Sequence, residues 1–323
     1  MKDCLMVLVS VIMGAYNHQC YIADAIESVL NQTMPDLELI IIDDASNDDT
    51  PQIIKNYQQK EPRIKAFFHQ KNQGIAATAN QCLNNANGQY ITFIGSDDLW
   101  VKTKLEKQLQ ILQKHPNWLV WSEGEIIDNT GNSTGKTFTK MHHADKKRKT
   151  GNIFREILDD NYIFGQSLMF QKKHLKNQFS TNLKYLCDYR FMVDLAFEHE
   201  FFFISEPLAK YRIHNNNSIN RDETEWNKDR IKLAKYFLQK YGSALSKNLR
   251  GNLYFKIGIA YSALDKDNLA KHYYFYALKT NSTSKEALLY IAYVLDGAKG
   301  FVGNNLLRLY MKINSLLQVR TYK

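Results

Sequence analysis

The sequence predicts an α/β fold in which helices flank a mostly parallel sheet, followed by a C-terminal helical appendage. Apolar, β-branched runs alternate with segments of helical spacing through residues 1–100. These runs lack the apolar–polar alternation of half-exposed strands, so both faces of each strand are expected to be buried, as in a helix-covered parallel sheet. From residue 219 the strand pattern stops and helical spacing takes over. A length of 323 residues accommodates one large α/β domain and a smaller module.

Four strands separated by three helices are expected in the first hundred residues. The strands are the runs LMVLVSVIMGA (5–15), LELIIID (37–43), RIKAFFH (63–69) and QYITFIG (89–95). The helices are expected at 21–32, 51–60 and 74–86. Thr50 and Pro51 form an N-cap followed by proline at the first helical position, which marks the start of the second helix. In such sheets ligands bind beyond the carboxyl ends of the strands, so polar residues there are candidate site residues.

Residues 101–218 predict a mixture of helix, strand and loop. In order, we expect a helix at 101–115, a strand at 117–128, a loop at 142–152, a helix at 187–199 and a strand at 200–214. The loop, HHADKKRKTGN, is basic and polar. A solvated loop explains it better than a metal site, although such a loop could also close over a bound ligand.

The segment 219–323 predicts helices that resemble tetratricopeptide repeats. The matching positions are Tyr254, Ile257, Gly258, Tyr261, Ala270, Tyr274 and Ala277. Ser282 replaces the usual proline, and the run 285–295 could begin a second copy. Residues 301–323 place leucines at helical spacing beside basic residues. That pattern fits either an amphipathic helix at a membrane surface or a helix packed on the appendage.

The net charge of +9 and the pI near 9.1 favour an anionic partner, which could be nucleic acid, a phosphorylated metabolite or an acidic lipid surface. Acidic pairs, rather than a basic stripe, lie at the expected ligand edge, so we expect no nucleic-acid partner. The four cysteines have no Cys-x-x-Cys spacing, which indicates reduced thiols in a cytoplasmic protein. The N-terminal apolar run is too short to span a bilayer.

Two acidic pairs end strands of the expected sheet. Asp97-Asp98 follows the fourth strand. A helix cap would need only one carboxylate, whereas two hard oxygen donors suit Mg²⁺ or Mn²⁺, so a metal site is favoured. Asp43-Asp44 ends the second strand, and the turn after it is rich in helix-capping residues. Asp44 could therefore belong to a capping turn, or it could accept the imide N–H of a uracil-like base.

Six motifs in a fixed order resemble those of family 2 glycosyltransferases. They are VSVIMGAYN, IIDDAS, NQGIAATAN, NANGQYITFIGSDD, CDYR and YRIHNNNS, and they span residues 7–218, roughly two thirds of the chain. The resemblance implies a Rossmann-like GT-A domain at 1–218, with a nucleotide-sugar half at 1–100 and an acceptor half at 101–218, and a helical appendage at 219–323.

The same resemblance implies an inverting, metal-dependent transferase that uses a UDP-sugar with Mn²⁺ or Mg²⁺. The acceptor would be a saccharide or a lipid-linked saccharide in the synthesis of capsule or lipopolysaccharide, with possible peripheral contact at the inner membrane. A non-catalytic scaffold that uses a GT-A-like domain and a helical tail is the alternative.

The resemblance also implies roles for individual residues. Gly14 and Tyr16 would line the nucleotide, Asp44 would bind the base, Asp97 would lie near the ribose or sugar, Asp98 and His214 would hold the metal, Arg212 would contact the diphosphate, and Asp188 would be the catalytic base. Asp188 could instead cap the following helix, with Arg190 as its ion-pair partner.

Two positions depart from the family pattern. Gly95 stands where many relatives carry the first Asp of an Asp-x-Asp-Asp motif. Thr78-Ala79-Asn80 stands where many carry Ala-Arg-Asn, so one expected contact to the donor is missing. The identity of the donor, rather than the fold, depends on these two positions.

Overall fold

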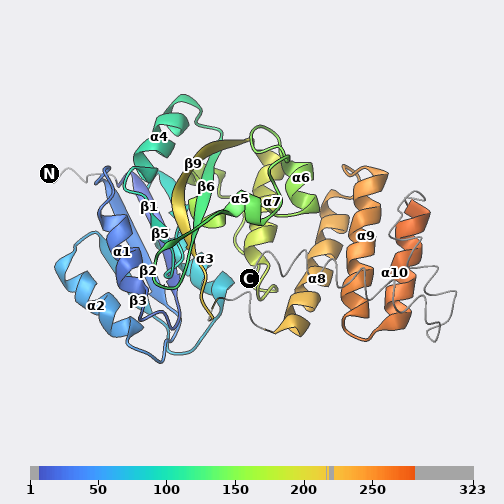
Figure 1. The fold of residues 1–323 in the computed structure, drawn as a ribbon, viewed down its shortest axis with the longest axis horizontal. Helices are drawn as coiled ribbons and strands as arrows, with labels where there is room; N and C mark the ends of the chain where they lie inside the picture. The colour runs from blue at the N-terminus through green and yellow to red at the C-terminus, as the bar shows by residue number, and fades with distance from the viewer. Residues whose placement is uncertain (1–6, 216, 218–221, 281–323) are drawn as a thin grey trace. The chain divides into compact units, whose positions relative to one another are not determined.

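The computed structural model describes residues 7–215, 217 and 222–280. These residues divide into two compact units with the break after residue 217, except that 158–160 group with the second unit. The first unit is a mixed α/β domain, as predicted, and its described strands form one nine-stranded sheet. Helices flank this sheet (Figure 1).

The first half of this sheet is parallel, as the uninterrupted apolar runs predict. β1 (Val9–Ala15) lies between β2 (Leu37–Asp43) and β4 (Tyr90–Phe93), and β3 (Ile64–Phe68) pairs with the other side of β2. Every residue of β2 and β4 is buried. Helices therefore cover both faces of these strands.

Three helices connect the parallel strands. They are α1 (Ile22–Leu30), α2 (Thr50–Lys60) and α3 (Ile75–Asn85), close to the predicted ranges. Right-handed crossovers place α1 and α2 on the same face of the sheet, because β1, β2 and β3 follow one another toward one edge. The connection from β3 to β4 runs back past β1 in the opposite direction, so α3 lies on the other face. Accordingly α1 contacts α2, while α3 packs on β1 and β2.

The second half of the sheet is mixed, which the sequence did not predict. β8 (Met169–Gln171) runs antiparallel between β4 and β6 (Leu119–Ile127), and β9 (Phe201–Arg212) runs parallel to β6. β5 (Leu99–Trp100) pairs with β9, and β7 (Ser133–Thr137) pairs with β6. β5 and β8 are too short to produce a periodic signal, and β7 is polar and mostly exposed, so pairing with longer neighbours defines all three. The carboxyl ends of β4, β6 and β9 nevertheless point to the same edge.

Four further helices and two 3₁₀ turns complete the described part of this unit. They are α4 (Lys104–Lys114), α5 (Phe138–Met141), α6 (Phe154–Asp159), α7 (Cys187–Glu198) and the 3₁₀ turns η1 (Gly165–Ser167) and η2 (Lys172–His174). The second unit contains α8 (Glu223–Tyr241), α9 (Lys247–Ser262) and α10 (Asp267–Thr280).

The described part of the appendage is helical, as predicted. Asp222 caps α8 by accepting hydrogen bonds from the backbone N–H groups of residues 224 and 225. A Cβ atom on Gly258 would lie 2.6 Å from the ring of Tyr274, so glycine permits the close approach of α9 and α10. Phe255, Ala270 and Ala277 pack in the same core.

Some expectations lie outside the described residues. They concern Ser282, the second repeat copy at 285–295 and the amphipathic segment 301–323. Within the part of the chain that the structure describes, no helix combines the length and apolarity needed to span a bilayer.

Candidate active site

Loops that follow the carboxyl ends of β1, β2, β4 and β9 meet at one edge of the sheet, here called the rim. The loops after β1 and β2 are tied directly. Asn17 N–H donates to Ser46 Oγ (2.9 Å), and its side-chain oxygen accepts the N–H of Asn47 (2.8 Å). His18 N–H donates to Thr50 Oγ1 (2.9 Å). These contacts give the first two rim loops one fixed geometry.

Much of the polar turn after β2 is structural. Asp48 accepts the N–H groups of Thr50 (3.0 Å) and Gln19 (3.0 Å). Both carboxylate oxygens of Asp43 bond to Ser46, through its N–H and its hydroxyl. Asp48 thus accepts the first N–H of α2, whereas Asp43 only closes the turn. The N-cap of α2 is Asp49, whose side chain makes no capping hydrogen bond, so the expectation that Thr50 is the N-cap is wrong, and Thr50 is the first helical residue.

Asp44 lies in a different, buried network with His69. Its Oδ1 lies 2.7 Å from His69 Nδ1 and accepts the N–H of Gln73 (2.8 Å), while its Oδ2 accepts the N–H of Gly74 (2.8 Å). His69 Nε2 faces the side-chain oxygen of Gln81 at 2.6 Å. Burial lowers the pKa of His69, but the hydrogen bonds to Asp44 and Gln81 outweigh it and raise the pKa overall. A protonated His69 donates one N–H to Asp44 Oδ1 and the other to the side-chain oxygen of Gln81. Asp44 Oδ2 accepts one N–H, from Gly74, and can accept a second hydrogen bond.

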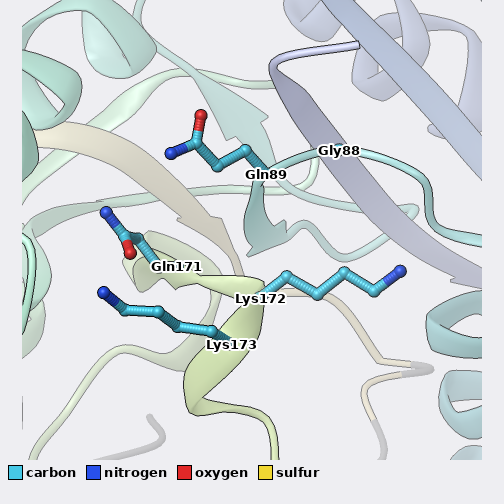
Figure 2. Close-up of a pocket in the computed structure, with 5 residues that line it drawn as sticks. All are labelled: Gly88, Gln89, Gln171, Lys172 and Lys173. Carbon is cyan, nitrogen blue, oxygen red and sulfur yellow. The ribbon is translucent and has the colours of Figure 1, made fainter. Parts of the chain in front are cut away.

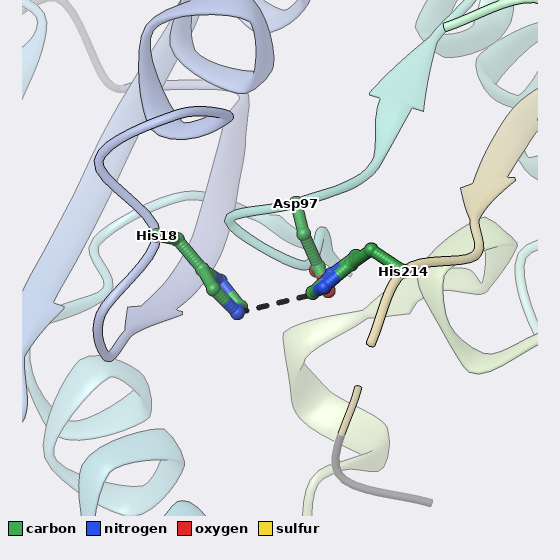
Figure 3. A group of neighbouring side chains, drawn as sticks. All are labelled: His18, Asp97 and His214. Atoms are coloured by element: carbon green, nitrogen blue, oxygen red, sulfur yellow. Dashed lines mark hydrogen bonds and ion pairs between the residues drawn. The ribbon is translucent and has the colours of Figure 1, made fainter. Parts of the chain in front are cut away.

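Asp97 joins two histidines at the rim (Figure 3). Its Oδ2 lies 3.0 Å from His214 Nε2 and 3.9 Å from His18 Nε2. The three donor atoms all lie within 4.8 Å of one another. Burial raises the pKa of Asp97, but the hydrogen bond from His214 and the adjacent imidazoles outweigh it and lower the pKa overall. Asp97 is therefore held as a carboxylate, which is the form that binds a cation.

Asp98 points elsewhere. Its Oδ1 accepts the backbone N–H of Arg212, and its side chain is buried. Burial and the neighbouring charge of Asp97 raise the pKa of Asp98 well above its ordinary value. A Cβ atom at Gly95 would lie 2.7 Å from Asp97 Oδ1 and 2.8 Å from Asp98 Oδ2. The departure from the family pattern at Gly95 thus leaves room for both carboxylates in this arrangement.

Arg212 is buried beneath the acidic pair. Its Nε donates to the backbone oxygen of Asp97 (2.8 Å) and its Nη1 to that of Asn129 (3.2 Å). Its Nη2 lies 3.4 Å from Asp24 Oδ2, and the guanidinium lies over the ring of Tyr21. Its contacts within the chain position the loop that carries Asp97.

Asp188 lies in the first turn of α7, whose N-cap is Leu186. The alternative in which Asp188 caps this helix is therefore wrong, and Arg190 pairs with Asp194 (3.7 Å) instead. The Asp188 side chain is exposed, and its Oδ1 accepts the N–H of Tyr189 (2.6 Å). Desolvation by surrounding protein raises its pKa.

Gly14 and Tyr16 lie at the end of β1. Gly14 is exposed, and a Cβ atom there would approach Thr78 Cγ2 to 3.1 Å. Tyr16 is half-buried directly after the strand. Thr78 is buried, and its hydroxyl has no hydrogen-bond partner among the described residues.

A separate depression lies at the opposite end of β4 (Figure 2). It has a volume of about 480 Å³ and is lined by Gly88, Gln89, Gln171, Lys172 and Lys173. Lys172 Nζ donates to the backbone oxygen of Ala86 (2.6 Å), just after α3. The depression is distinct from the rim.

Sequence reasoning overlooked two rim histidines. His18 lies three residues beyond β1, and His69 comes directly after β3 and was the last residue of the third predicted strand. Their position at or just beyond the carboxyl ends of predicted strands was the available signal, since ligand-binding residues gather there.

Comparison with known proteins agrees with this architecture. The family model for glycosyl transferase family 2 matches residues 10–177. A glycosyltransferase of Haemophilus influenzae, itself uncharacterized, is 38% identical over 192 residues, which are 58% of this chain and 72% of the relative.

Two solved structures share the fold at 16% sequence identity. S. aureus TarS 1–349 in complex with UDP-GlcNAc gives a TM-score of 0.65, covering 84% of this chain and 81% of that one. The mannosyltransferase PcManGT of Pyrobaculum calidifontis, in complex with GDP-Man and Mn²⁺, gives a TM-score of 0.53, and the match covers 97% of this chain and 84% of that one.

A GT-A sheet with this polar rim defines the class of protein as a glycosyltransferase. The chain belongs to glycosyl transferase family 2, as its six motifs predicted.

Proposed function

We propose that the protein is a metal-dependent, inverting glycosyltransferase that moves a sugar from a UDP-sugar to a saccharide or lipid-linked saccharide acceptor of a cell-surface polysaccharide. The observation that carries the metal-dependent part is the contact between the Asp97 carboxylate and His214 Nε2 at the rim, at 3.0 Å. Residues 1–100 would bind the donor, residues 101–218 the acceptor, and residues 219–323 would form the appendage.

The rim residues fit a divalent cation. Carboxylate oxygen and imidazole nitrogen are both suitable ligands, and an Asp97 with a lowered pKa supplies the charged form. We assign the metal to Asp97 and His214. Asp98, which the sequence suggested as a ligand, is directed at the backbone of Arg212. The bound cation would supply electrostatic stabilisation for the departing diphosphate.

The base pocket would be formed by Asp44. Its Oδ2 accepts one N–H from Gly74 and has capacity for a second, such as the imide N–H of uracil. His69, Gln73 and Gly74 hold the carboxylate in place. Gly14 and Tyr16 would line the nucleotide beside it. The solved neighbours bind UDP-GlcNAc and GDP-Man respectively, so the preference for uracil rests on Asp44.

Asp188 would act as the base. The acceptor hydroxyl oxygen attacks the anomeric carbon from the side opposite the diphosphate, and its proton passes to the Asp188 carboxylate. The bond between the anomeric carbon and the diphosphate oxygen breaks, and UDP departs with that electron pair. Exposure of Asp188 allows an acceptor to reach it.

A donor panel tests the proposal. The full chain is incubated with UDP- and GDP-sugars, with Mn²⁺ or with EDTA, in the presence of bacterial membrane extract as a source of acceptor. We expect nucleotide diphosphate release from one UDP-sugar, its loss in EDTA, and inverted anomeric configuration in the product by NMR. Release from GDP-sugars alone, or undiminished release in EDTA, contradicts the corresponding part of the proposal.

A further inference from the structure

His18 has the geometry of a metal ligand, although the motifs do not single it out. It comes from the loop after β1, whereas Asp97 follows β4 and His214 follows β9 (Figure 3). The three side chains thus approach from different segments of the rim. The rings of His18 and His214 lie edge to face, with centroids 5.5 Å apart and planes at 88°.

A hydrogen bond fixes the direction in which His18 presents its ring. Its Nδ1 lies 2.7 Å from Ser96 Oγ, and its backbone N–H donates to Thr50 Oγ1. When Nδ1 donates to the hydroxyl, Nε2 carries the lone pair and faces Asp97. Metal-binding histidines almost always donate their other ring N–H to an oxygen in this way.

The spacing of the donor atoms fits a shared cation. Ligand-to-metal distances of about 2.0–2.2 Å allow two ligands of one ion to lie up to about 4.4 Å apart. The Asp97 oxygen lies 3.0 Å from one histidine nitrogen and 3.9 Å from the other, so both pairs that include Asp97 fall within this limit. The two histidine nitrogens lie within 4.8 Å of each other, so the rings would close by at most a few tenths of an ångström around an ion. The 3.9 Å distance exceeds that of a hydrogen bond, so His18 and Asp97 form an ion pair when the imidazole is protonated, and a cation can take the place of that proton.

We propose that His18 is a third protein ligand of the cation, which makes the site a set of two histidines and one carboxylate. The inference rests on the proposed function, because it concerns the same cation. Two imidazoles favour Mn²⁺ over Mg²⁺, which prefers oxygen ligands. Three protein ligands also hold the ion before any nucleotide arrives and leave positions open for diphosphate oxygens.

Metal binding to the nucleotide-free full chain tests this inference. Mn²⁺ is titrated and the free ion is followed by electron paramagnetic resonance, then Mg²⁺ is added as competitor. We expect one Mn²⁺ per chain in the parent, and at least about tenfold weaker binding with less selectivity against Mg²⁺ in His18→Gln. Ser96→Ala should give an intermediate loss. His115→Gln, an exposed histidine stacked on Trp118, is the matched control and should bind like the parent.

The outcomes separate the two proposals. If Asp97→Asn loses Mn²⁺ while His18→Gln binds as the parent does, His18 is not a ligand and the proposed cation site stands. If Asp97→Asn and His214→Gln also bind Mn²⁺ like the parent, the cation site itself is wrong. A parent chain that binds no Mn²⁺ without nucleotide overturns the three-ligand set. Melting temperatures near the parental value exclude unfolding as the cause of any loss.

Discussion

Asp98 Oδ1 accepts the backbone N–H of Arg212 at 3.0 Å, and this bond joins the end of β9 to the loop after β4. Asparagine retains an accepting oxygen in the same place, so Asp98→Asn should keep the bond and bind Mn²⁺ nearly as the parent does. Asp97→Asn should lose Mn²⁺ binding, because the carboxylate between the histidines disappears. Calorimetric titration of both variants distinguishes them. Loss of Mn²⁺ in Asp98→Asn would restore the ligand assignment made from the sequence.

Asp188→Asn should lower turnover without weakening donor binding. A general base typically contributes about 10²–10⁴-fold to the rate, and a residue outside the metal and base sites should leave UDP and Mn²⁺ affinity unchanged. Since the pKa of Asp188 is raised, the parental rate should begin to fall on acidification at a pH above that of an ordinary aspartate. Rate profiles against pH and single-turnover kinetics provide the measurement. Transfer at the parental rate by the variant would remove the base assignment.

Asp44→Asn should reduce the preference for UDP over GDP and ADP. Both carboxylate oxygens of Asp44 now accept hydrogen bonds, from His69, Gln73 and Gly74. The NH₂ group of asparagine cannot accept one, and such a mismatch at a buried polar group costs about 1–3 kcal/mol. Calorimetry with the three nucleotides measures the change. Asp48→Asn is the matched control, since Asp48 bonds only to the turn and to Gln19 in the described contacts. Equal affinity of the parent for all three nucleotides would contradict a uracil pocket.

Gly95→Ala should weaken Mn²⁺ binding although residue 95 has no ligating side chain. The new methyl group would stand closer than 3.0 Å to oxygens of both Asp97 and Asp98, so one or both carboxylates must move. Gly165→Ala is the control, because a Cβ there meets only the flexible end of Met192 at 3.2 Å. Mn²⁺ titration compares the two variants. Parental affinity in Gly95→Ala would show that the loop accommodates a side chain without loss.

Lys104 should make stability depend on pH. It is fully buried, it bonds to Thr92 and Gln108, and burial lowers its pKa well below 10.5. Between the lowered pKa and 10.5 the unfolded chain binds a proton that the folded chain does not, so stability should rise with pH in that window. Urea unfolding from neutral to mildly alkaline pH measures this rise.

Lys104→Met should flatten that dependence, and Lys114→Met, at an exposed position of the same helix, should leave it unchanged. A parent whose stability does not rise over this range would contradict a lowered pKa at Lys104.

The parallel half of the fold was predictable because its strands are buried on both faces and therefore appear as unbroken apolar runs. The mixed half was not, because β8 has three residues and β5 has two. Strands this short carry no periodic signal, and hydrogen bonding to β4, β6 and β9 determines where they form.

The candidate site was predictable in position and less so in detail. The sequence placed Asp97 and Asp98 at the carboxyl end of β4, but the order of two neighbouring residues does not show where their side chains point. The hydrogen bond from Asp98 N–H to Gly95 O closes a turn. In this turn the Asp97 carboxylate lies beside the histidines, and the Asp98 carboxylate contacts the backbone of Arg212. His18 was overlooked because its partner Ser96 is 78 residues away in the chain.

The contacts of β9 bear on how the enzyme is made. His214 meets Asp97 across 117 residues of sequence, and Arg212 meets Asp98 across 114. During synthesis, a nascent chain that has completed β1 to β4 still lacks one of the two proposed histidine ligands and the arginine beneath the acidic pair. If the proposed site is right, the chain would be able to bind the cation only after β9 has joined the sheet. Because an ion that binds only the folded form shifts the equilibrium toward it, Mn²⁺ would favour finished molecules over shortened ones.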